Sequence, residues 1–74
     1  MRKRWKVGDI IEFKDIKFHY IIKILHINER DYEYTLLYGN NHYAPNTFQF
    51  GSRVDIESKK ISREKAMLEL LWTI

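Results

Sequence analysis

Histidine side chains are the first candidates for chemistry in this chain, because imidazole is a common metal ligand and the sequence has three of them. His19 and His26 are seven positions apart, which places them on opposite faces of a strand unless a bulge intervenes. His42 stands alone in a polar segment, no carboxylate follows at a ligand-like spacing, and the chain has no cysteine. We therefore expect no metal site and no cofactor.

Catalytic groups are equally hard to assemble from the sequence. Ser52, Ser58 and Ser62 have neither a nucleophile elbow nor a base at a recognisable spacing. Asp9 and Glu12 could pair as carboxylates, but acids beside the solvent face of a strand are usually only hydrated, and the scattered glycines form no phosphate-binding loop. The sequence predicts that the protein is not an enzyme.

Basic residues form the strongest signal for nucleic acid. They are concentrated at the two ends of the chain, around a middle in which acids outnumber bases, and the net charge is +3. Clustered cations release counterions from a phosphate backbone, and Trp5 could stack on a base. The residues expected to contact nucleic acid or phosphate are Arg2, Lys3, Arg4, Trp5, Lys6, Arg53, Lys59, Lys60, Arg63 and Lys65.

The alternative for these residues is a charged terminus that keeps the protein soluble, with Trp5 folded onto the domain. We favour this alternative, because the acidic middle of the chain would repel a long polyanion. The balance reverses if the N-terminal arm and residues 59–65 meet on one face.

A polar loop over residues 39–46 is a third candidate site. Its neutral donors and acceptors suit a small polar ligand or a protein backbone, and with Arg53 or the basic segment on phosphates it could sequester a small nucleotide. The alternative is an ordinary turn in which asparagines bond their own backbone. The predicted loop residues are Asn40, Asn41, His42, Tyr43 and Asn46.

A β-hairpin over residues 18–38 organises the rest of the fold. Two runs rich in β-branched and aromatic residues flank the short polar segment 28–31, which is typical of an antiparallel hairpin. In the first run the apolar alternation changes phase near Lys23, which indicates a bulge or burial of both faces. In the second run Tyr32, Tyr34 and Tyr38 share one face, as core packing or as an aromatic surface.

The remaining elements complete a small, mainly β domain. Strands are expected at residues 10–13 and 47–50, and residues 53–57 are either a fifth strand or one helical turn capped by Ser52. Residues 62–72 should form a helix capped by Ser62 that docks on the sheet, and its apolar residues finish the core or make a dimer seam. The predicted organisation is a basic flexible arm at 1–6, then one bent five-stranded antiparallel sheet or barrel with a C-terminal helix at 7–74.

The segment Lys6-Val7-Gly8-Asp9-Ile10-Ile11, followed by a bent strand and a hairpin, resembles the opening of Src-homology-3-type barrels, including KOW and Tudor-like modules. That resemblance implies a binding module, and no site residue is carried over from it. The abundance of Ile, Lys, Asn and Tyr is also similar to that of short proteins carried by phages and prophages of low-GC bacteria.

Together these features predict a non-enzymatic, cytoplasmic binding protein with no membrane span, in a bacterium or an infected bacterial host. The leading interpretation is a phage- or prophage-derived factor that binds and blocks a host macromolecule, for example a defence system. The alternatives are a nucleic-acid-binding barrel and a sponge for a small nucleotide, and a homodimer is left open.

Overall fold

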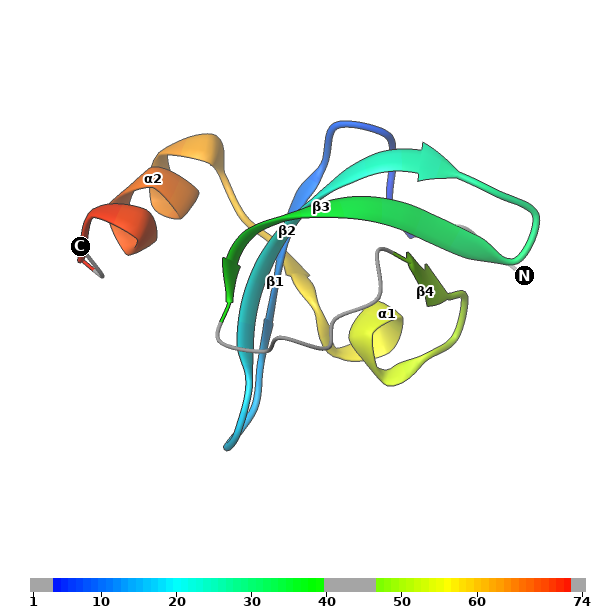
Figure 1. The fold of residues 1–74 in the computed structure, drawn as a ribbon, viewed down its shortest axis with the longest axis horizontal. Helices are drawn as coiled ribbons and strands as arrows, with labels where there is room; N and C mark the ends of the chain where they lie inside the picture. Colours follow the sequence, from blue (N-terminus) through cyan, green and yellow to red (C-terminus); the bar gives the residue numbers. More distant parts are fainter. Residues whose placement is uncertain (1–3, 40–46, 73–74) are drawn as a thin grey trace.

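A single antiparallel sheet forms the centre of the molecule (Figure 1). The computed structural model describes residues 4–39 and 47–72. The strands are β1 (Ile10–Lys14), β2 (His19–Ile27), β3 (Asp31–Gly39), β4 (Thr47–Gln49) and β5 (Lys59–Lys60), and the helices are α1 (Arg53–Glu57) and α2 (Arg63–Trp72). The strand order is β4-β3-β2-β1-β5, so the predicted mainly β fold with a C-terminal helix is confirmed, as an open sheet rather than a barrel.

Short polar turns join the first three strands, as the sequence predicts. Between β1 and β2, the Asp15 carboxylate accepts hydrogen bonds from the backbone N–H groups of Lys17 and Phe18. Between β2 and β3, Asn28 donates its side-chain amide to the Asp31 carboxylate. These side chains replace the ladder hydrogen bonds that the backbone loses at each turn.

Two register shifts between β2 and β3 decide which side chains share a face. The first leaves Leu37 without a direct partner, and the second leaves Leu25 without one. The phase change predicted near Lys23 is thereby confirmed. Since residues directly opposite each other point to the same side, Tyr38 lies with Ile21, away from Tyr32 and Tyr34, and the predicted single row of tyrosines is wrong.

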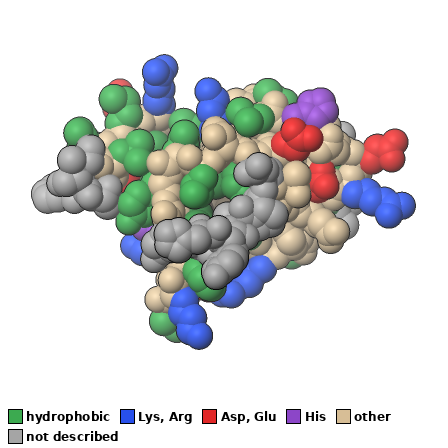
Figure 2. Space-filling view, viewed as in Figure 1, with side chains coloured by type: hydrophobic (Ala, Val, Ile, Leu, Met, Phe, Trp, Pro, Cys, Tyr) green, Lys and Arg blue, Asp and Glu red, His purple; other side chains and the backbone are tan. Residues whose placement is uncertain are grey.

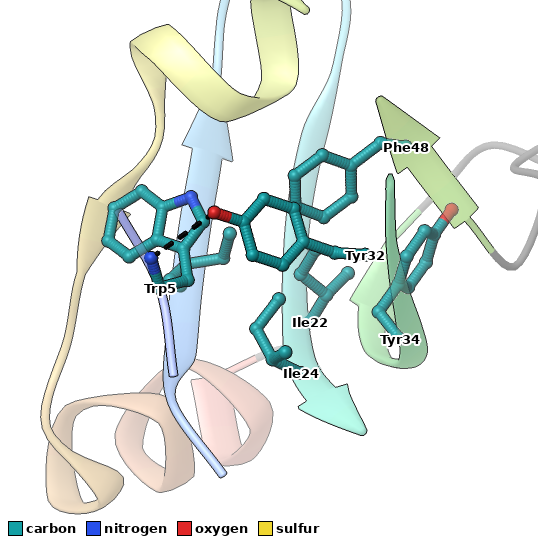
Figure 3. Packing of buried hydrophobic residues seen from close by; sticks show 7 residues of the cluster. Trp5, Ile22, Ile24, Tyr32, Tyr34 and Phe48 are labelled. Carbon is teal, nitrogen blue, oxygen red and sulfur yellow. Dashed lines mark hydrogen bonds between the residues drawn. The ribbon is translucent and has the colours of Figure 1, made fainter. Parts of the chain in front are cut away.

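Both faces of the sheet are covered, each by its own apolar cluster. The first cluster packs β4, α1 and the N-terminal segment on one face, and the second packs α2 on the other, which explains why the consecutive residues Ile21 and Ile22 are both buried. The buried members of the first cluster are Trp5, Ile11, Ile22, Ile24, Tyr32, Tyr34 and Phe48 (Figure 3). Those of the second are Ile21, Ile61 and Ala66.

The N-terminal segment belongs to the domain from Arg4 onward. Trp5 is only 6% exposed, and the Arg4 guanidinium donates to the backbone carbonyls of Asp55 and Ile56 at 2.7 and 2.6 Å. The predicted flexible arm over residues 1–6 is therefore corrected at residues 4–6, and residues 1–3 lie outside the described part of the chain. Burial of the indole holds this segment against the first cluster.

Residues 53–57 are helical, the second of the two predicted alternatives. The Ser52 hydroxyl accepts the N–H of Asp55, and the Asp55 carboxylate accepts the N–H of Gly51 at 2.7 Å. These two bonds satisfy donors that a fifth strand would have to pair elsewhere. The fifth strand is formed instead by Lys59 and Lys60, which pair with β1.

Helix α2 begins as predicted, with the Ser62 hydroxyl accepting the N–H of Lys65 at 3.0 Å. Its contact with the sheet is narrower than expected. Ala66 is buried and Leu70 half-buried, whereas Met67, Leu68 and Leu71 are 54%, 55% and 64% exposed. A small residue at the point of contact lets the helix approach the sheet closely but buries little area, so most of the apolar stripe remains at the surface.

Candidate functional site

A groove of about 620 Å³ lies between α2 and the sheet. Its lining comes from β1, β2, β3, β5 and α2 and from the residues just before β1 and α2. The apolar lining residues are Ile10, Leu37, Ile61, Ala66, Met67 and Leu70, and the charged ones are Asp9, Lys23, Lys60 and Arg63. The groove therefore combines apolar side chains with three cations and one acid.

The charges of the groove are unequally satisfied. Asp9 is engaged twice, by the backbone N–H of Lys6 at 2.9 Å and by the ammonium of Lys60 at 3.3 Å. Lys23 and Arg63 are exposed and make no ion pair with any residue in the described ranges. Two cations that line the groove thus remain available to an anionic ligand.

Side chains of α2 extend the apolar surface beyond the groove. In Figure 2 hydrophobic side chains gather at the left of the view, where Figure 1 places α2. Met67 lines the groove, and Leu68 and Leu71 are more than half exposed along the same helix. Exposed apolar residues that adjoin a groove are typical of an interaction surface.

The predicted nucleic-acid residues are divided between the two sides of the sheet. Arg4 is held at the end of α1, and Arg53, in α1, pairs with Asp15 at 2.9 Å and with Glu57 at 2.5 Å. Arg63 and Lys65 lie on α2, where the Lys65 ammonium is 3.8 Å from Glu12. Among the described residues, Lys60 and Arg63 meet in the groove, but Arg4 and Arg53 do not join them, and the acids beside several of these cations weaken the field that a phosphate backbone requires.

Trp5 occupies the position of a core residue. Its indole is buried in the first cluster, where the Arg4 guanidinium lies 4.9 Å from the ring centroid. The backbone N–H of Trp5 donates to the Tyr32 hydroxyl, shown as a dashed line in Figure 3. A buried ring offers no face to a base, so this placement favours the packing alternative given for Trp5.

Three side chains of the kinds that bind metal ions, two of them far from the third along the chain, converge on the α2 side of the sheet. They are Glu12 on β1, His19 on β2 and Glu69 on α2, and one potential ligand atom from each lies within 4.8 Å of the others. His19 Nε2 is 2.6 Å from Glu12 Oε2, and the imidazole packs edge to face against Tyr38 with ring centroids 5.0 Å apart. All three side chains are half-buried.

The pairing of β1 with β2 could have predicted part of this cluster, namely the contact between Glu12 and His19. Lys14 is directly opposite His19, so Glu12, two residues before Lys14, is the diagonal neighbour of His19 on the same face. The position of Glu69 in the cluster depends on how α2 packs on the sheet, and no pattern within a short stretch of sequence predicts that packing. The shift at Leu25 also brings His19 and His26 to one face, which is the exception that the sequence analysis allowed for a bulge, but they lie near opposite ends of β2.

The predicted loop residues Asn40, Asn41, His42, Tyr43 and Asn46 lie outside the described residues, so that prediction remains untested.

Comparison of the chain with protein-family profiles, curated protein sequences and solved structures found no match. Within residues 4–39 and 47–72, neither helix has the length and apolar character needed to cross a membrane.

Proposed function

We propose that this protein is a non-enzymatic binding domain whose groove under α2 docks an acidic protein segment with apolar anchor residues. In this proposal it is a small phage- or prophage-derived factor that acts stoichiometrically, by covering a surface of a host macromolecule. One observation carries the proposal: an apolar groove is bordered by two cations, Lys23 and Arg63, that have no ionic partner among the described residues.

The chemistry of the groove favours a protein over a nucleic acid. Ile10, Leu37 and Met67 suit aliphatic or aromatic side chains, and Lys23 and Arg63 suit carboxylates beside them. A nucleic-acid site would need stacking platforms, whereas every described residue lining this groove is aliphatic, polar or charged.

Selection of peptides from a random displayed library against the full chain tests this function. We expect the selected peptides to combine acidic and large apolar residues. The variant Lys23→Glu/Arg63→Glu should weaken binding of a selected peptide by at least about tenfold, because two attractive contacts become repulsive.

The matched control is Lys17→Glu/Arg30→Glu, which changes the net charge equally at two exposed turn residues away from the groove. It should bind like the wild type. If both variants weakened binding equally, the effect would come from overall charge alone and the proposal would be overturned. Selection of peptides without acidic residues would also overturn it. Tight, steeply salt-dependent binding of an oligonucleotide would instead favour the nucleic-acid alternative.

A further inference from the structure

We infer that Glu12, His19 and Glu69 form a binding site for Zn²⁺ that fastens α2 to the sheet. The three residues come from three elements, β1, β2 and α2, and their ligand atoms already lie within 4.8 Å of one another. One imidazole nitrogen with two carboxylate oxygens is a ligand set that zinc accepts in proteins, at about 2.0–2.2 Å from each atom. The imidazole nitrogen disfavours Mg²⁺ and Ca²⁺, which prefer oxygen ligands.

Neighbouring groups orient these ligands. The second oxygen of Glu12 faces the Lys65 ammonium at 3.8 Å, which leaves Oε2 directed at His19. Tyr38 packs against the His19 ring and fixes its plane. Neighbours that restrict ligand side chains in this way reduce the reorganisation that metal binding requires.

Charge also favours a cation at this point. The two glutamates bring two carboxylates into a half-buried setting, where the Lys65 ammonium lies 3.8 Å from Glu12. Zn²⁺ would replace the hydrogen bond between Glu12 and His19, and any proton held there would pass to solvent. Three protein ligands leave a coordination position for water.

A bound ion would compensate for the narrow contact that α2 makes through Ala66. Glu69 lies one turn beyond Ala66, so coordination would hold the helix at a second point. Since α2 forms one wall of the groove, Zn²⁺ would also fix the shape of that groove.

Isothermal titration of the chelator-treated full chain with ZnCl₂ tests the inference. We expect one Zn²⁺ per chain, and a loss of affinity greater than about tenfold in both Glu69→Gln and His19→Ala, since even outer-sphere changes cost that much. The control His26→Ala removes a histidine near the other end of β2 and should bind like the wild type.

Hydrogen exchange gives a second readout. Zn²⁺ should slow amide exchange in α2 of the wild type but not of Glu69→Gln, a substitution that preserves side-chain shape. The inference is overturned if the wild type binds no Zn²⁺ at millimolar concentration, if Glu69→Gln binds normally, or if the control loses binding. Peptide binding measured in chelator tests the proposed function separately.

Discussion

Tyr32 joins three separate segments through one side chain. It is fully buried on β3, and its ring lies 5.0 Å from that of Phe48 and 4.7 Å from that of Phe50. Its hydroxyl accepts the backbone N–H of Arg4 at 3.0 Å and that of Trp5 at 3.4 Å. The hydroxyl therefore satisfies backbone donors at the edge of the core, where water has little access.

The substitution Tyr32→Phe should lower the free energy of unfolding by about 1–3 kcal/mol, because it leaves these backbone donors without their acceptor while keeping the ring. Urea unfolding followed by fluorescence measures the change, and hydrogen exchange should accelerate at Arg4 and Trp5. Tyr34→Phe is the control at neutral pH, since Tyr34 is buried on the same strand but does not hold the N-terminal segment. Equal effects of the two substitutions would contradict this account of the hydroxyl.

At the scale of elements, the turn between β1 and β2 depends on one carboxylate. Hydrogen bonds from the N–H of Phe18, and also from that of Lys17, lower the pKa of Asp15, and Arg53 beside it acts in the same direction. A carboxyl whose pKa is lower in the folded state than in the unfolded chain stabilises the fold. That stabilisation is fully present when the pH is above the ordinary pKa of the group, near 3.8. That contribution is lost as the pH falls through the lowered pKa.

We predict that an NMR titration will place the Asp15 pKa below 3.8 and that Arg53→Gln will move it part of the way back. The return should be partial, because the backbone donors remain. The control is Arg30→Gln, at the other hairpin turn, which should leave the Asp15 pKa unchanged. An Asp15 pKa at or above 3.8 in the wild type would show that the turn is not held in this way.

At the scale of the whole molecule, a central sheet separates two apolar clusters of unequal size. The larger involves the N-terminal segment, β4 and α1, and the smaller depends on Ala66 of α2 against Ile21 and Ile61. Stability in so small a domain is expected to be marginal. Local opening should therefore begin at α2, a ten-residue helix in which Ala66 is the one buried side chain among those described.

The substitution Ala66→Asp should detach α2, because it places a charge where the residue is 2% exposed. We expect amide protection in α2 to be lost while that of β2 and β3 is retained, which hydrogen exchange followed by mass spectrometry can measure. Met67→Asp, at an exposed position of the same helix, should leave the protection of α2 near that of the wild type. Simultaneous loss of protection in the central strands would instead show that the two clusters unfold as one unit.

Local patterns were sufficient for most of the elements. Alternating apolar residues, the polar turns and the serine before the last helix predicted β1, β2, β3 and α2, because the forces that define them act over a few residues. Residues 53–57 could not be decided in this way, since their alternation suits a strand and only the bonds around Ser52 and Asp55 favour a helical turn.

The amino-acid sequence by itself determined the mainly β class, the central hairpin, its change of phase near Lys23 and the capped C-terminal helix. Only the tertiary structure decided that Trp5 is buried, that Tyr38 faces away from Tyr32, and that Glu69 lies beside His19. The physical reason is one of range. Turns, caps and alternation depend on neighbours along the chain, whereas strand register and helix docking depend on contacts between residues far apart in the sequence.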